Sequence, residues 1–275
     1  TGDVIGPGVN GTDSDINGAG DLVDSVVDSG LINAIQALLD GAEPYSKVLF
    51  DFGSIYGANF TINKPLNIIS NNNTKLIGVD GNPPIRFAEG SEGSVLNGFE
   101  IINAGGDGVL IEADDILIRN CLVNVSNGTG INIYRSNGTS IMDTVVYNAD
   151  EGILVNQSTN TLIDGVSVRD CYSDGIWVYQ SMHTVIVNSL IEDNGKDPYK
   201  LLYGENEIVP SQGYGLNFKV NVPASESRAN NILIDDSTDN YIYNNTINYG
   251  YFGIHLYHSF LYYKVPLWIQ LYHIL

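Results

Sequence analysis

A short core that begins with glycine recurs along this chain, and it constrains the fold more than any other feature. Its copies are GVLI at Gly108, GINI at Gly130, GILV at Gly152, GIWV at Gly175, GLNF at Gly215 and GIHL at Gly253. Successive copies start 22, 22, 23, 40 and 38 residues apart. A near-constant period of this length is typical of a solenoid, in which each repeat forms one coil that stacks on its neighbours. The two longer intervals indicate inserted loops or a degenerate coil.

The residues one and three places after each glycine are apolar, and this period of two is that of a β-strand. They are Val109 and Ile111, Ile131 and Ile133, Ile153 and Val155, Ile176 and Val178, Leu216 and Phe218, and Ile254 and Leu256. In stacked coils these positions form aliphatic columns inside the solenoid, and we expect each glycine to allow a sharp turn before the strand. The pattern predicts an all-β fold, a right-handed single-stranded parallel β-helix.

A second short strand comes before each glycine and ends in Asn or Asp. The terminal residues are Asn103, Asn124, Asn148, Asp170 and Asn248. We predict that these stacked side chains form a hydrogen-bonded ladder along the axis.

The two ends of the chain depart from the repeat. Residues 21–40 carry apolar side chains at helical spacing and stop before Gly41, a candidate C-cap, which predicts a helix that covers the open edge of the first coil. The segment 260–275 has neither Asn nor Gly and fits a cap, a partner-binding strand, a truncation or a shifted reading frame. We therefore expect an N-terminal arm and capping helix (1–42), a parallel β-helix (43–259) and an atypical C-terminal segment (260–275).

The chain is strongly acidic, with 32 Asp and Glu against 12 Lys and Arg and a formal net charge of -20. This charge opposes binding to nucleic acid and to anionic membrane surfaces, and it favours cations or neutral glycans as partners. Calcium is the cation that we expect, and no cofactor is required. No run of about 18 apolar residues occurs, so we expect no transmembrane segment. The start at Thr1 leads us to expect a processed mature chain.

Eight Asn-x-Ser/Thr sequons favour an exported glycoprotein, since they are about twice as many as chance would give at this composition. We expect glycans at Asn10, Asn59, Asn72, Asn127, Asn137, Asn156 and Asn244. We exclude Asn124, because the predicted ladder would hide it in a stacked turn. The alternative is that Asn-rich turns lie beside Ser and Thr by accident.

Three segments, NAIQALLDGA, KVLFDFGSIYGANFTINKPLNIIS and NTKLIG, resemble the opening of many pectate-lyase-like β-helix proteins, and the repeats extend this resemblance to about Ser259. INKPLNIIS, the Asn-rich coils, the many Tyr residues and the frequent sequons together are similar to surface-layer and adhesin-like proteins of methanogenic archaea. That narrower resemblance implies a secreted, noncatalytic glycoprotein of the cell envelope that self-assembles or contacts glycans and neighbouring copies. The repeats alone fit polysaccharide lyases, hydrolases and epimerases equally well.

The residue before each glycine is the candidate position for acid or base chemistry, because neighbouring coils bring these side chains close together. These residues are Asp107, Thr129, Glu151, Asp174, Tyr214 and Phe252. If the protein is an enzyme, we expect Asp107, Glu151 and Asp174 to be its catalytic residues, with Asp150 nearby. The alternative is ordinary turn chemistry, in which Asp often precedes Gly.

The motifs of familiar β-helix enzymes are incomplete in this chain. In a polygalacturonase-like pattern, Asp107 fits the first carboxylate, whereas Thr129 stands where paired aspartates are expected. The Gly-His-Gly and Arg-x-Lys elements of that pattern are absent, as is the Asp-Pro-His-Glu element of alginate epimerases. An enzyme is therefore the alternative and not the preferred function.

Aromatic side chains occupy positions two and four places after several of the glycines, which face outward on the same strands. The expected carbohydrate-binding residues are Tyr134, Trp177, Tyr179 and Tyr257, with Asn132 and His255 beside them. Aromatic rings stack on the apolar faces of sugars, although Tyr and Trp also favour strands in general. We thus predict an extracellular or cell-surface protein with a structural or adhesive role and a carbohydrate-binding face.

Overall fold

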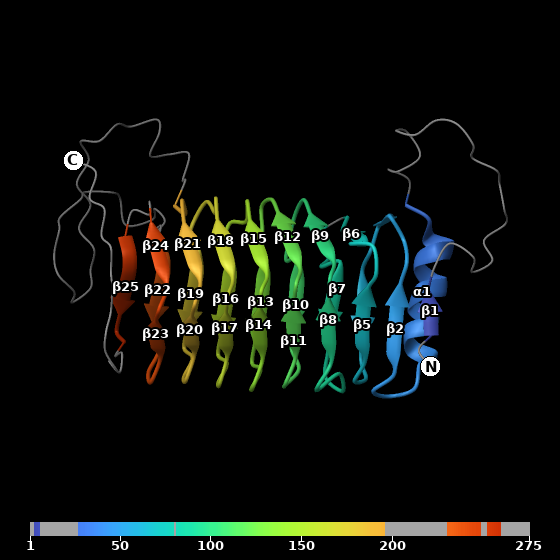
Figure 1. Ribbon diagram of the computed structural model, residues 1–275, viewed down its shortest axis with the longest axis horizontal. Coiled ribbons are helices and arrows are strands. Elements are labelled where there is room, and N and C mark those ends of the chain that lie inside the picture. The colour runs from blue at the N-terminus through green and yellow to red at the C-terminus, as the bar shows by residue number, and fades with distance from the viewer. Residues whose placement is uncertain (1–2, 6–26, 80, 196–229, 249–251, 260–275) are drawn as a thin grey trace.

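The computed structural model of the protein describes residues 3–5, 27–79, 81–195, 230–248 and 252–259. Its strands stack along one long axis, with helix α1 (Ser29–Gly41) at the N-terminal end and β25 (Phe252–Tyr257) at the other end (Figure 1). Each coil contributes one strand in turn to three parallel sheets, which we name A, B and C. The predicted parallel β-helix is therefore confirmed.

Sheet A holds nine strands of the described residues, and sheets B and C hold eight each. In sheet A these are β1 (Asp3–Ile5), β2 (Lys47–Phe50), β5 (Asn67–Ser70), β8 (Val95–Asn97), β11 (Leu117–Arg119), β14 (Ser140–Met142), β17 (Leu162–Asp164), β20 (Val185–Val187) and β23 (Tyr241–Tyr243). In sheet B they are β3 (Ser54–Tyr56), β6 (Lys75–Ile77), β9 (Glu100–Asn103), β12 (Leu122–Val125), β15 (Val145–Tyr147), β18 (Ser167–Arg169), β21 (Leu190–Glu192) and β24 (Thr246–Asn248). In sheet C they are β4 (Phe60–Ile62), β7 (Ile85–Phe87), β10 (Val109–Ile111), β13 (Ile131–Tyr134), β16 (Ile153–Asn156), β19 (Ile176–Tyr179), β22 (Asn230–Asp235) and β25.

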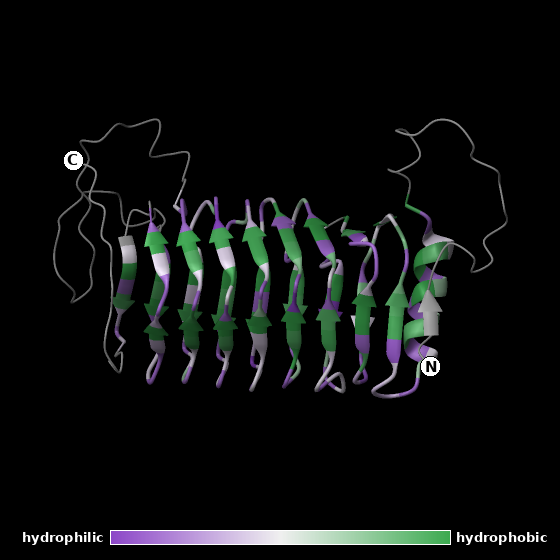
Figure 2. Cartoon of the chain, viewed as in Figure 1, coloured by the Kyte–Doolittle hydropathy of each residue, from purple (hydrophilic) through white to green (hydrophobic). Residues whose placement is uncertain are grey.

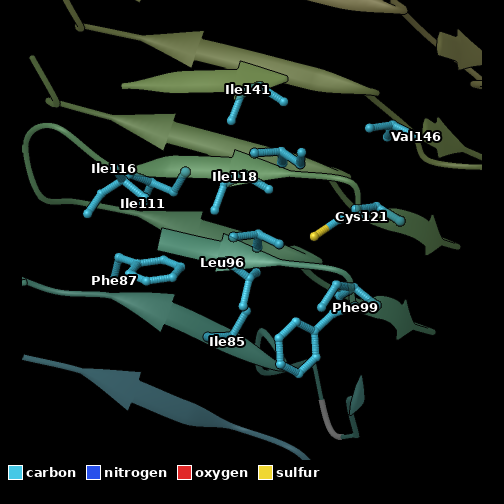
Figure 3. Packing of buried hydrophobic residues seen from close by; sticks show 14 of the residues in the cluster. Ile85, Phe87, Leu96, Phe99, Ile111, Ile116, Ile118, Cys121, Ile141 and Val146 are labelled. Atoms are coloured by element: carbon cyan, nitrogen blue, oxygen red, sulfur yellow. The ribbon is translucent and has the colours of Figure 1, made fainter. Parts of the chain in front are cut away.

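The glycine-led repeats form sheet C, and their apolar residues point into the solenoid. Ile131 pairs with Ile153, and Ile153 pairs with Ile176, so one column of buried isoleucines runs along the axis. The strands are coloured as mainly hydrophobic in Figure 2, and Figure 3 shows Ile111 of sheet C among side chains of sheet A such as Ile118 and Ile141. The period of two in the sequence thus identifies the core correctly.

The repeat glycines are required by close packing and not by a left-handed turn. At Gly152 a Cβ would lie closer than 3.0 Å to the Gly175 carbonyl oxygen of the next coil and to a methyl group of Val168 in sheet B. The φ angle of Gly152 is outside the left-handed region. The expected sharp turn is therefore the wrong reason for these glycines, which allow sheet B to approach the start of each sheet C strand.

The coil that follows β19 is not the one predicted at GLNF (Gly215). The neighbour of β19 in sheet C is β22, in which Ile176 pairs with Ile232, and the neighbour of β22 is β25. Asn231 thus takes the place of the repeat glycine, and Gly215 lies outside the described residues. The Asn231 side chain is fully buried. It accepts a hydrogen bond from the Asn194 amide at 2.9 Å and donates one to the Asn248 carbonyl at 2.9 Å.

Helix α1 covers the edge of the first coil as predicted, but it begins later than Asp21. Asp28 is the N-cap, and its carboxylate accepts a hydrogen bond from the Leu31 N–H at 3.0 Å. Ile32, Ile35 and Leu39 are the buried face of the helix. Residues 6–26 and 260–275 lie outside the described part of the chain.

Serine, and not asparagine, forms the continuous ladder. The backbone N–H groups of Ser136, Ser158, Ser181 and Ser237 each donate to the hydroxyl of the serine in the next coil, at 2.9–3.1 Å, and Ser259 is the last member within the described residues. The predicted Asn ladder is wrong because its members are not in one register: Asn103 pairs with Val125, although Asn148 does donate to Asn124 at 3.1 Å.

Candidate functional site

The residues that precede the repeat glycines form one column at the start of sheet C. The N–H groups of Gly108, Gly130, Gly152 and Gly175 donate to the carbonyls of Thr129, Glu151, Asp174 and Asn230, at 2.8–3.0 Å. The prediction that Asp107, Thr129, Glu151 and Asp174 are stacked is therefore confirmed. The next member is Asn230 and not Tyr214, which lies outside the described residues; Phe252 pairs with Asn230.

Asp107 belongs to a small polar network with the next coil. Its carboxylate accepts a hydrogen bond from the Asn132 amide at 2.9 Å. Burial raises the pKa of Asp107 above its usual value, and the negative charge of Glu112 adds to this, whereas hydrogen bonds from Asn132 and Thr129 act in the opposite direction. The carboxyl group is thus partly desolvated.

Glu151 lies two coils along the same column. Its pKa is also raised, first by burial and then by the negative charges of Asp150 and Asp107, while a hydrogen bond from Thr129 opposes the shift. Burial raises the pKa of Asp150 too. At about 4.8 Å a coil, Asp107 and Glu151 are about 10 Å apart along the axis, with Thr129 between them.

Asp174 has a structural role that the sequence did not reveal. Its side chain is only 3% exposed, and its Oδ1 accepts hydrogen bonds from both the backbone N–H and the amide of Asn230, each at 2.7 Å. These bonds fasten β22 to the coil before it. Of the three carboxylates proposed from the sequence, Asp107 and Glu151 therefore remain the candidates for chemistry.

The predicted aromatic side chains lie on the outer face of sheet C, beside the acidic column. Trp177 and Tyr179 alternate with the buried Ile176 and Val178 and are half-buried, with ring centroids 5.6 Å apart and ring planes inclined at 51°. Tyr134 is also half-buried, and the Arg135 guanidinium lies 4.9 Å from its ring centroid.

Tyr257 occupies the same outward register, since it pairs with Asp235, the partner of Tyr179. His255 pairs with Leu233, which in turn pairs with Trp177. Leu233 and Asp235 are buried, although both positions face outward. On the coils of β13, β16 and β19, by contrast, every outward residue is half-buried and not buried.

The sequons lie mainly in exposed turns. Asn59, Asn72, Asn127, Asn137 and Asn244 are exposed, Asn156 is half-buried on sheet C, and Asn10 lies outside the described residues. The expectation that Asn124 is hidden is wrong, because its side chain is on the outward face of β12 and only partly buried. Its neighbours in the core are Val123 and Val125.

Two features at this site were not identified from the sequence. One is the hydrogen bond by which Asn132 orients Asp107, and the other is Asn156, whose amide oxygen is buried without a hydrogen-bond partner. Both residues stand two or four places after a repeat glycine, and that spacing is the signal that could have found them.

No group of three or more His, Cys, Asp or Glu side chains in the described ranges is arranged to hold a metal ion. Within those ranges, no helix is long and apolar enough to cross a membrane. Cys121 and Cys171 are buried free thiols, and burial raises their pKa values to about 11 and about 12.

Comparison with solved structures gives the same fold. An alginate lyase from Paenibacillus sp. str. FPU-7 aligns with a TM-score of 0.51 and 14% identity, over 86% of this chain and 98% of its own. The pectate lyase Pel9A aligns with a TM-score of 0.55 and 15% identity, over 78% of this chain and 65% of its own. At such low identity the likeness concerns the fold alone.

A search of curated proteins gives no significant match. The family model described as "Right handed beta helix region" matches residues 85–264, which is more than half of the chain and includes every repeat considered above. The chain belongs to the right-handed β-helix family.

Proposed function

We propose that this protein is an extracellular, envelope-associated β-helix that binds carbohydrate on the outer face of sheet C. The observation that carries the proposal is the pair of half-buried rings of Trp177 and Tyr179, 5.6 Å apart on an outward strand face, with Tyr134 two coils away. Amphipathic rings held rigidly by a sheet offer apolar surface at little entropic cost, which suits the C–H faces of sugars.

The charge of the protein supports a neutral glycan as the ligand. The formal net charge is -20, and Asp107 and Glu151 border the aromatic face. A uronic-acid polymer would meet repulsion from these carboxylates once they ionise. The exposed sequons and the resemblance to surface-layer proteins support the placement in a cell envelope, where neighbouring copies are further partners.

A polysaccharide-active enzyme is the second candidate, and one observation favours it. Asp107 and Glu151 both have raised pKa values and lie about 10 Å apart along the axis, at about 4.8 Å a coil. That separation is close to the range in which one carboxyl group acts as acid and the other activates water in an inverting hydrolase.

Matched variants on a glycan array separate the two functions. Replacing Trp177 and Tyr179 with Ala should abolish binding, whereas Tyr147→Ala, a half-buried tyrosine on sheet B, should leave it unchanged. Replacing Asp107 and Glu151 with amides should leave binding intact. Turnover of a polysaccharide by the parent, and its loss in the amide variant, would instead establish the enzyme.

A further inference from the structure

Three outward residues of sheet C form one column along the solenoid axis. Tyr134 pairs with Asn156, and Asn156 pairs with Tyr179, so successive coils present a ring, an amide and a ring. Strands of a sheet lie about 4.8 Å apart, which places the two rings about 10 Å from each other. The column is thus a straight surface that repeats every second coil.

A polar row runs beside this column. Each column residue is followed directly by an exposed side chain with a left-handed backbone: Arg135 at φ 53°, Gln157 at φ 51° and Gln180 at φ 48°. Arg135 Nε donates to Gln157 Oε1 at 2.9 Å, and Gln157 Nε2 donates to Gln180 Oε1 at 3.1 Å. Each of these three coils therefore offers one column residue and one exposed polar group, both in the same register.

This repeat matches an extended β-1,4-linked glycan. The rise of one sugar in such a chain is close to the spacing of the coils, and successive sugars are turned by about half a revolution, so that the same face recurs at every second sugar. The rings of Tyr134 and Tyr179 recur at every second coil in the same way. The polar row then lies where sugar hydroxyl groups leave the chain.

A glycan crossing the sheet along one strand would fit less well. It would meet Trp177 and then Tyr179, whose planes are inclined at 51° and present no common flat surface to one chain. On the strands of β13 and β16, the residues beside the column are Asn132 and Leu154, which carry no ring.

From these observations, and resting on the proposed carbohydrate binding, we infer that the ligand is a neutral, extended β-linked glycan that lies parallel to the solenoid axis on Tyr134, Asn156 and Tyr179, one sugar per coil. Asn156 is its polar contact. The Asn156 amide oxygen is buried and has no hydrogen-bond partner in the described structure, and rotation of the side chain can offer this oxygen to a sugar hydroxyl.

The same geometry predicts that Asn156 is not glycosylated, in contrast to the expectation from its sequon. An N-linked sugar there would occupy the column between the two rings. The hydroxyl of the sequon residue Ser158 is also buried in the serine ladder, where it donates to the carbonyls of Ile133 and Asn156 at 3.2 and 2.9 Å.

Calorimetric titration with cello- and chito-oligosaccharides of two to six sugars tests the orientation. The affinity of the parent should rise at least about tenfold between two and three sugars, because the third sugar reaches the second ring. Tyr134→Ala should remove this gain while it binds the disaccharide as the parent does. Asn156→Ala should weaken binding of the disaccharide as well, because the second sugar loses its polar contact. Trp177→Ala removes one ring of the pair on which the proposed carbohydrate binding rests and should weaken every length, whereas Tyr147→Ala should weaken none.

The outcomes distinguish carbohydrate binding itself from the axial orientation of the bound glycan. If the parent binds none of these sugars, the proposed function itself is contradicted. If it binds them without dependence on length, and Tyr134→Ala is indistinguishable from the parent although Trp177→Ala is not, carbohydrate binding stands and the axial orientation is wrong. A glycan found at Asn156 in native material by peptide mass spectrometry would also overturn the inference. Melting temperatures of all variants control for folding.

Discussion

Gln36 pairs with the backbone of Thr61 as a further strand would. Its amide nitrogen donates to the Thr61 carbonyl at 2.9 Å, and its amide oxygen accepts from the Thr61 N–H at 3.0 Å. Thr61 is in β4, the edge strand of sheet C. One side chain of α1 thus satisfies backbone groups that would otherwise be a template for a second chain.

Gln36→Ala should therefore destabilise the fold by about 1 to 3 kcal/mol, because a paired donor and acceptor at the edge lose their partners. Urea denaturation measures the change, and Asn33→Ala, an exposed position on the same helix, is the control. We also expect the variant to self-associate in size-exclusion chromatography. Unchanged stability in both variants would mean that the edge does not depend on Gln36.

Gly152→Ala should be severely destabilising, since its Cβ would come closer than 3.0 Å to the Gly175 carbonyl and to Val168. The added methyl group forces apart two packed coils, so we expect the free energy of unfolding to fall by about 1 to 3 kcal/mol or more. Gly41→Ala is the matched control, because no atom lies within 4 Å of its Cβ position. It should be neutral or stabilising by up to about 1 kcal/mol. Equal melting temperatures for the two variants would refute the packing explanation.

Glu151→Gln should raise stability at neutral pH more than at pH 4. The folded pKa of Glu151 lies above its usual value of 4.5, so the folded state holds this proton more tightly than the unfolded state does. Well below pH 4.5, Glu151 is protonated in both the folded and the unfolded state, and its carboxyl group no longer affects stability. As the pH rises from the pKa of Glu151 in the unfolded state towards its higher pKa in the folded state, the Glu151 carboxyl group progressively lowers the stability of the fold.

Denaturation curves of parent and variant at pH 4 and pH 7 measure this difference. Glu89→Gln, which removes an exposed negative charge, controls for the general effect of net charge. A stability gain for Glu151→Gln that is the same at both pH values, or no larger than that of the control, would contradict the role of burial at Glu151.

Calcium should raise the melting temperature of the protein at millimolar concentration, because the net charge of -20 makes the chain repel itself along the solenoid. Calorimetry with calcium, with chelator, and with sodium chloride at matched ionic strength measures the effect. If calcium and sodium act alike, the stabilisation is screening alone, and if calcium and chelator give the same value, we would abandon a role for cations.

The core and the outward face could be predicted from the sequence because successive side chains of a strand point to opposite faces of the sheet, so each residue faces either the core or the outside. Ile176 and Val178 had to be buried once Trp177 and Tyr179 faced outward, and they are. The acidic column followed from the same register, since Asp107 and Glu151 precede glycines that stack.

What the sequence could not reveal depends on contacts between coils. The glycine pattern missed β22 because Asn231 stands in that position, and its side chain hydrogen-bonds to Asn194 and to the Asn248 carbonyl. The role of Asp174 depends on Asn230, 56 residues later, and no local pattern connects them. Asn124 was placed inward because the Asn residues were aligned by their place before the glycine, whereas the register differs by one residue between coils.

The serine ladder has a consequence for how such a protein can change over evolution. The N–H of Ser181 reaches the hydroxyl of Ser237 at 2.9 Å across 56 residues, with the same geometry by which Ser158 reaches Ser181 across 23. Each serine thus hydrogen-bonds to the serine of the coil that stacks next, whatever length of chain separates the two residues. The entropic cost of closing a loop grows by only about 0.6 kcal/mol for each doubling of the loop's length. A boundary between coils is therefore a position where new sequence can be inserted while the stacked coils stay the same.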